Sequence, residues 1–251
     1  NKKESGIFVD HNTKMYGNIS MKTLLMMMLF ASCSNLFAAQ NTKALEVKEH
    51  KLKNGLTVWL NEDHSQPKVF GAVVVKAGAK DCPDTGIAHY FEHMMFKGTD
   101  KIGTVDYDAE KTLLDSIALK YDELAATEDE AARSQIQKEI NELSIRSSDY
   151  VIPNEFNRLI SKYGGSGLNA ATSYDATIYF NTFSPQYMSQ WAEINSERLL
   201  NPVFRLFQSE LETVYEEKNM YGDFIGGPVM DRLLARYFAP HPYAYPIIGS
   251  T

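Results

Sequence analysis

The chain has 251 residues, of which 44% are hydrophobic, 12% aromatic and 23% charged, as in an ordinary globular protein. Its formal net charge of −7 argues against nucleic acid as the main partner, because phosphate binding needs clustered lysine and arginine. The length is sufficient for one large domain or for up to two ordinary domains, with ample hydrophobic core.

The first 40 residues have the pattern of an export signal. Met21 resembles the true start of the protein, so residues 1–20 are interpreted as an upstream or non-native segment. A lysine, a short apolar run and small residues follow, and we expect residues 21–39 to be a signal peptide rather than a short buried segment. Cleavage at the small residues predicts an exported protein, periplasmic or secreted. Lipidation of Cys33 would instead give a lipoprotein, which is the only membrane attachment that we expect.

Three short runs rich in β-forming residues come next, at residues 46–52, 56–61 and 69–76. An Asn-Gly pair separates the first two runs and predicts a tight turn. The third run contains Val73–Val75, a continuous apolar stretch that is typical of a central strand. We therefore expect a sheet that begins with these strands.

A motif rich in metal-binding side chains follows the third strand, where residues 86–99 read G-I-A-H-Y-F-E-H-M-M-F-K-G-T. In a helix, His89 and His93 point from one face, one turn apart, and two neutral imidazoles so placed can hold one zinc ion. Glu92 lies on the same side and can accept a proton from metal-bound water. The pattern is H-x-x-E-H, the inverted form of the H-E-x-x-H zinc-protease motif.

A histidine pair on a helix is more often a surface accident or a packed core pair than a metal site. Here apolar residues surround the polar ones, among them Ile87, Phe91 and Met94, so we expect a buried helix that stops near Gly98. Buried histidine and glutamate side chains need partners, and a metal ion would satisfy them. The motif therefore indicates a zinc peptidase.

The middle of the chain changes character and becomes helical. Apolar residues at helical spacing predict a helical hairpin over residues 104–150, with a capping box at Thr127–Glu130 and charged outer faces that are solvated or, alternatively, used for docking. Further elements are predicted in chain order: a helix at 153–163, strands at 168–173 and 176–182, an amphipathic helix at 184–200 and an acidic helix at 207–221.

A catalytic zinc ion takes three protein ligands and keeps one open position for water, so a third ligand must come from elsewhere in the chain. The acidic helix offers Glu210 and Glu217 on one face and Glu212 and Glu216 on another. The pair seven residues apart suggests one ligand and one supporting carboxylate. Acidic helix faces are usually only solvated, so spacing alone leaves the metal role of this helix open.

Three sequence motifs together resemble a known family. They are G-I-A-H-Y-F-E-H-M-M-F-K-G-T, G-L-N-A-A-T-S-Y-D-A-T-I-Y-F and E-L-E-T-V-Y-E-E, in this order, within residues 45–251. This region resembles the N-terminal catalytic domain of the M16 metallopeptidases, the pitrilysin and insulinase family. The resemblance implies an α+β fold in which helices pack on one face of a mainly antiparallel sheet, and the order of predicted elements agrees with it.

The same resemblance implies a role for five side chains. His89, His93 and Glu217 become ligands of Zn²⁺. Glu92 becomes the general base, and Glu210 becomes a nearby carboxylate that supports the site.

The resemblance also implies a substrate-binding strand. Asn169, Ala170 and Thr172 match the family's edge strand, to which an extended substrate adds itself. From the residues alone, Asn169 would be read as a turn residue after Gly167. The implied substrate is a peptide or an unfolded polypeptide, because only an extended segment can pair with an edge strand.

Two features depart from the best-known family members. The segment 104–150 lengthens the gap between His93 and Glu217, and we interpret it as an inserted helical hairpin that leaves the ligands intact but could change substrate access. The chain also stops inside what resembles the first homologous domain. We therefore expect a fragment of a longer peptidase, with the missing C-terminal domains as its partners, and its independent activity stays open.

The function predicted from the sequence is that of a zinc-dependent endopeptidase. One alternative is a non-catalytic or partner-dependent subunit that binds peptides or serves as a structural module, although all four positions of the motif set are filled. A second alternative is a zinc hydrolase acting on a non-peptide bond. The third is a structural metal site, for which Cys82 is the only candidate cysteine ligand.

Overall fold

The computed structural model describes residues 46–250. The predictions for residues 1–20, for the signal peptide at 21–39 and for Cys33 lie outside the described residues. The chain divides after Asp63 into two compact units. No helix among the described residues is both long enough and apolar enough to span a bilayer.

The first unit contains the predicted hairpin. Strands β1 (Val47–Lys51) and β2 (Thr57–Asn61) pair antiparallel. The turn between them is the one that the Asn-Gly pair predicts: Gly55 has a φ of +90°, which suits a residue without a Cβ, and the Asn54 side chain accepts a hydrogen bond of 3.1 Å from the backbone N–H of Leu56.

The second unit is built on a three-stranded antiparallel sheet. Strands β3 (Val69–Val75), β4 (Ser166–Thr172) and β5 (Thr177–Phe183) lie in the order β3-β5-β4. Strand β5 alternates buried and half-buried residues, as expected when one face of a sheet is covered. The prediction that Val73–Val75 marks a central strand is wrong, because β5 is central and Val74 is 51% exposed on the other face of the sheet.

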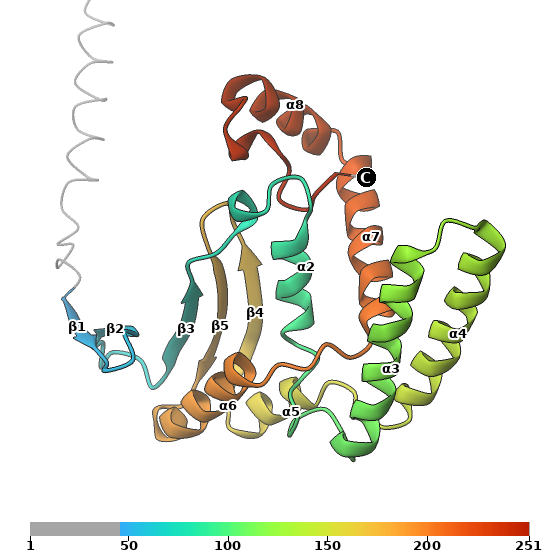
Figure 1. Cartoon of the computed structure of the whole chain (residues 1–251). Coiled ribbons are helices and arrows are strands. Elements are labelled where there is room, and N and C mark those ends of the chain that lie inside the picture. The colour runs from blue at the N-terminus through green and yellow to red at the C-terminus, as the bar shows by residue number, and fades with distance from the viewer. Residues whose placement is uncertain (1–45, 251) are drawn as a thin grey trace, which may run out of the picture. The chain divides into compact units, whose positions relative to one another are not determined.

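Helices cover the face of this sheet that carries Tyr179 and Phe183 (Figure 1). This face packs on Phe96, which follows the first helix, and on Trp191. Helices α2 (Ile87–Met94), α5 (Glu155–Lys162) and α6 (Met188–Leu200) contact the sheet. The second unit also contains α3 (Tyr107–Ala126), α4 (Glu130–Ser148), α7 (Phe207–Asp223) and α8 (Gly226–Phe238). The predicted α+β arrangement, with helices packed on one face of an antiparallel sheet, is confirmed.

The core of the second unit lies between the sheet and helices α5 and α6. Its buried members are Ile102, Phe156, Ile160 and Ile194. Hydrophobic burial of this kind contributes about 25 cal/mol for each Å² of apolar surface removed from water. This core supports the segment that follows α2, because Ile102 belongs to that segment.

Helices α3 and α4 form the predicted helical hairpin. Asp106 caps α3 by accepting a hydrogen bond of 3.1 Å from Ala109, and Asp129 caps α4 by accepting one of 2.8 Å from Ala132. The predicted capping box at Thr127–Glu130 is therefore wrong. Thr127 instead ends α3, where its hydroxyl donates to the carbonyl of Glu123.

Three further details differ from the sequence prediction. Helix α2 ends at Met94, before Gly98, and its burial is one-sided: Met94 is buried while Ile87 and Phe91 are 52% and 44% exposed. Helix α8 was not predicted, because the Gly-Gly-Pro sequence in its first turn is usually read as a helix breaker. Proline is well tolerated in a first turn, where its missing N–H has no helical partner.

Candidate metal centre

Helix α2 carries the three motif side chains towards one side. It begins after Gly86, whose φ is +67° and where a Cβ would lie 2.3 Å from the carbonyl oxygen of Ile248, so the chain turns into the helix there only with glycine. His93 comes four positions after His89 in the helix, and the centroids of their rings lie 4.8 Å apart, edge to face. The predicted one-turn spacing of the two imidazoles is confirmed as geometry.

Helix α7 lies beside α2 and brings a carboxylate to the histidine pair (Figure 1). The Oε2 atom of Glu217 lies 3.4 Å from Nε2 of His93 and 3.8 Å from Nε2 of His89. With metal–ligand bonds of about 2.0–2.2 Å and tetrahedral angles, neighbouring ligand atoms lie about 3.3–3.6 Å apart. One ligand atom from each of the three residues lies within 4.8 Å of the other two, so a small closure of the site would let the three groups hold one metal ion.

Glu210 lies two turns before Glu217 on the same helix and contacts the other ring nitrogen of His93. Its Oε1 atom is 2.9 Å from Nδ1 of His93, and its Oε2 atom pairs with Nζ of Lys97. A carboxylate on the second ring nitrogen fixes the orientation of a metal-binding histidine and leaves Nε2 facing the metal. Among residues 46–250, His89 has no such contact: its Nδ1 atom is buried and has no hydrogen-bond partner there.

The two histidines have opposite electrostatic environments. Burial, together with the neighbouring His93, lowers the pKa of His89 and so favours the neutral imidazole that a metal ion needs. The hydrogen bond to Glu210 raises the pKa of His93. Burial tends to raise the pKa of Glu210, but hydrogen bonds from His93 and Lys97 outweigh it, and the net pKa is lowered.

Glu92 is 7% exposed and is held by the sheet. The hydroxyl of Thr172, in strand β4, donates a hydrogen bond of 2.6 Å to its Oε2 atom. Glu92 and the three candidate ligands line one cavity of about 870 Å³. The cavity is completed by residues of β4, α7, α8 and the segment after α8, which include Asn169, Ala170, Thr172, Tyr221, Met230, Leu234, Ile247 and Ile248.

Strand β4 has a strand neighbour on one side only among residues 46–250. The backbone N–H of Ser173 donates to the carbonyl of Ala176, and in an antiparallel ladder the direction of these groups alternates. The backbone groups of Ala171 therefore point to β5, and those of Ala170 and Thr172 point away from it. The N–H of Ala170 indeed donates to the side chain of Asn169 at 2.9 Å. The outward groups are placed to pair with an added strand.

The sequence prediction missed Lys97 and assigned Thr172 a different contact. Lys97 lies four residues after His93, a spacing that would have placed it near the same face if the helix continued. Thr172 was expected to contact substrate, and the structure shows its hydroxyl on Glu92. No sequence signal in β4 indicates which helix its side chains face.

Two helices present two histidines and a glutamate around one point, beside β4, an edge strand among the described residues. This arrangement defines a candidate metal-dependent hydrolase. The family model described as Insulinase (Peptidase family M16) matches residues 57–131, a range that includes all of α2. The resemblance to this family that the motifs predict is thus confirmed as a sequence similarity over these residues.

Similarity to individual proteins extends beyond the residues that the family model matches. The chain is 23% identical over 208 residues to the "Uncharacterized zinc protease YmxG" of Bacillus subtilis (strain 168), which covers 81% of this chain and 39% of that protein. A solved protease from Helicobacter pylori aligns with a TM-score of 0.57 and 21% identity, over 82% of this chain and 39% of its own.

Pitrilysin aligns with a TM-score of 0.54 and 19% identity, over 84% of this chain and 18% of its own. At these identities the two solved structures show a shared fold, and they carry no assignment of individual residues. The chain therefore spans well under half the length of each of these three proteins.

Proposed function

We propose that the chain forms the zinc-binding part of an endopeptidase that hydrolyses peptides or unfolded polypeptide segments. One observation carries the proposal: the Glu217 carboxylate lies 3.4 and 3.8 Å from the two histidine Nε2 atoms, with Glu92 in the same cavity. His89, His93 and Glu217 would hold the zinc ion. The zinc-protease name of the Bacillus relative supports the choice of metal.

Each remaining residue of the site has a chemical task in this proposal. Bound zinc supplies a Lewis acid, which lowers the pKa of water and polarises a carbonyl group. Glu92 accepts a proton at its carboxylate and delivers it to the leaving amine. The Thr172 hydroxyl fixes one oxygen of that carboxylate, and Glu210 fixes the ring of His93.

Strand β4 is the proposed binding element for substrate. The outward backbone groups of Ala170 and Thr172 would form main-chain hydrogen bonds with an extended peptide, and Asn169 would release the N–H of Ala170 to it. Main-chain pairing recognises an extended conformation rather than particular side chains. The predicted export of the protein would place such substrates in the periplasm or outside the cell.

The proposal is tested by the zinc content of the purified 251-residue chain after exhaustive dialysis. We expect close to one zinc ion per chain and loss of the metal in Glu217→Ala. Glu212→Ala is the matched control, because Glu212 is an exposed carboxylate on the same helix, and it should keep the metal. A chain without zinc, or a Glu217→Ala variant with full zinc, would contradict the proposal.

A further inference from the structure

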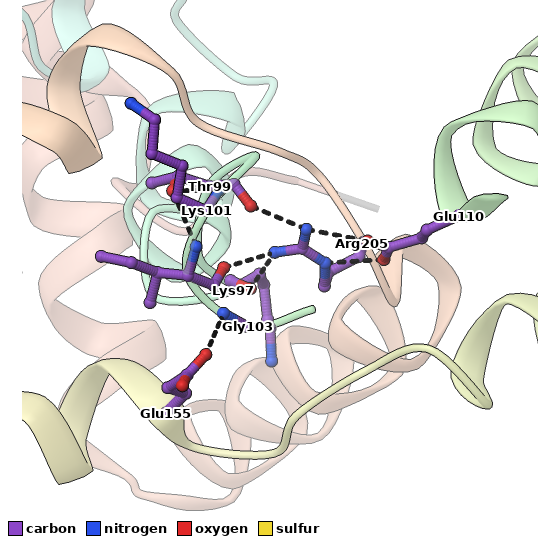
Figure 2. A network of polar contacts seen from close by, with 8 residues as sticks. Lys97, Thr99, Lys101, Gly103, Glu110, Glu155 and Arg205 are labelled. Atoms are coloured by element: carbon purple, nitrogen blue, oxygen red, sulfur yellow. Dashed lines mark hydrogen bonds and ion pairs between the residues drawn. The ribbon is translucent and has the colours of Figure 1, made fainter. Parts of the chain in front are cut away.

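One fully buried ion pair lies next to the metal centre and has no task in the proposed chemistry. Arg205, two residues before α7, donates from Nε to Oε1 of Glu110 at 2.7 Å and from Nη2 to Oε2 at 3.0 Å (Figure 2). Glu110 belongs to the first turn of α3, and both side chains are 0% exposed. The pair thus joins the helical hairpin to the start of α7.

The remaining donors of Arg205 bind the turn that follows α2. Its Nη1 atom donates to the carbonyl oxygens of Lys97, at 2.8 Å, and Ile102, at 3.1 Å, and Nη2 donates to that of Thr99 at 2.8 Å (Figure 2). All five N–H groups of the guanidinium are therefore used. A lysine ammonium has only three donors and no planar fork, so it cannot reproduce this arrangement.

The turn itself is shaped to fit the guanidinium. Gly98 has a φ of +103°, and a Cβ there would lie 2.1 Å from the carbonyl oxygen of Ile102 and 2.8 Å from Nη1 of Arg205. The backbone of Val203 also donates to the carbonyl of Gly98 at 3.1 Å. The segments before α7 and after α2 therefore meet in one arrangement, which we call the Arg205 clamp (Arg205, Glu110 and the turn 97–102).

Contacts beside the clamp extend it to the metal centre. Tyr90 of α2 donates from its hydroxyl to the carbonyl of Phe207, at the first residue of α7, at 2.6 Å. Tyr121 of α3 donates to the side chain of Gln208 at 3.0 Å. Lys97, whose carbonyl accepts from Arg205, pairs through its ammonium with Glu210, which in turn contacts His93.

Helix geometry makes the position of Glu217 sensitive to this clamp. Glu217 lies ten residues after Phe207, which is about 15 Å along a helix at 1.5 Å per residue. If α7 tilted by about 5° at its first residue, the backbone at Glu217 would therefore move sideways by about 1.3 Å. Metal sites tolerate deviations of only about 0.2 Å in ligand distance.

We propose that Glu110 and Arg205 are positioning residues for the metal centre, and that the helical hairpin braces α7 against α2 through them. The inference rests on the proposed zinc site. It gives the segment predicted as an insertion a defined task. A buried ion pair adds little stability relative to apolar side chains of the same size. It can, however, select one relative position of the segments that carry its two partners.

The test compares metal binding in folded variants of the 251-residue chain. Arg205→Lys keeps the charge but loses the fork, and Glu110→Gln keeps the volume but loses the charge. We expect both to bind zinc about 10- to 100-fold more weakly in competition with a chromophoric chelator, as for other residues that orient ligands. Cobalt substituted for zinc should also show a changed d–d absorption spectrum.

The matched control is Phe183→Leu, a buried substitution in β5 that packs on Trp191 and does not touch the clamp. It should lower thermal stability but leave zinc affinity within about twofold of wild type and the cobalt spectrum unchanged. Glu110→Asp, which keeps the charge and shortens the side chain, is measured if the other variants do not fold. It should show the same loss of affinity.

Two negative results are distinguishable. If Arg205→Lys or Glu110→Asp is folded by circular dichroism and binds zinc and cobalt as wild type does, the positioning role is overturned and the metal site stands. If the wild-type chain itself binds neither metal, the zinc site fails and the positioning role fails with it.

Discussion

At the scale of single residues, the side chains of the candidate metal centre are held by specific partners. Thr172 fixes Glu92 and Glu210 fixes His93, each through one hydrogen bond, of 2.6 and 2.9 Å. Both partners come from elements other than α2, so the motif in the sequence is only the inner part of the site. The two partners also allow the proton-transfer role and the metal-binding role to be separated by substitution.

Glu92→Gln removes the proton acceptor while keeping the size and polarity of the side chain. We expect zinc content to stay at the wild-type level and kcat on an unfolded fluorogenic peptide to fall by about two to four orders of magnitude. Metal analysis and turnover are measured on the same preparation. Turnover equal to that of wild type would remove Glu92 from the mechanism.

Glu210→Gln tests the electrostatic coupling in the metal-free chain. The raised pKa of His93 contributes stability that is fully present below its unfolded pKa of about 6.5 and is lost as pH rises through the higher folded pKa. The variant lacks the Glu210 carboxylate, so this contribution should shrink. We therefore expect its deficit in thermal stability, in the presence of a chelator, to be larger at pH 6 than at pH 8. An equal deficit at both pH values would argue against the coupling.

At the scale of elements, the sequence predicted local structure well and packing poorly. The H-x-x-E-H helix, the hairpin α3–α4 and the positions of the strands along the chain could be predicted, because each depends on a pattern within a few neighbouring residues. The apolar run Val73–Val75 was misplaced because β propensity reports a strand and does not report which neighbours it pairs with. Spacing alone could not show which glutamate of α7 could be a metal ligand, because that depends on how α7 packs against α2.

Strand β4 offers a test of substrate pairing that leaves the sheet intact. Ala170→Pro removes a backbone N–H that points away from β5, so we expect the fold to persist and KM for an extended peptide to rise about 2- to 12-fold, the value of one hydrogen bond. The matched control is Ala171→Pro, which removes an N–H directed at β5. It should destabilise the chain by about 1–3 kcal/mol, as judged by thermal unfolding.

At the scale of the whole molecule, the candidate metal centre joins segments that lie far apart in the sequence. Helix α2 comes near the start of the second unit and α7 near its end, and the sheet, the hairpin and the clamp hold them together. A ligand shared between such segments links metal binding to global stability, because the unfolded chain does not hold the three groups together.

Zinc should therefore raise the unfolding temperature. At a free concentration 100 times its Kd, a ligand of the native state adds about 2.7 kcal/mol of stability. For a unit of this size that corresponds to about 5–10 °C. The shift should disappear in His93→Ala and persist in the exposed-site control His50→Ala, as measured by calorimetry with and without zinc.

The contact between Gly86 and the segment after α8 has a consequence for the order of biosynthesis. A Cβ on Gly249 would lie 2.6 Å from the backbone nitrogen of Gly86, and Ser250 donates to the carbonyl of Asp84 at 3.1 Å. A ribosome releases residues 84–86 long before residues 249 and 250. The turn that opens the histidine helix therefore reaches its final contacts only after residues 249 and 250 have been made. Until that segment emerges, a nascent chain carries both histidines without their complete surroundings.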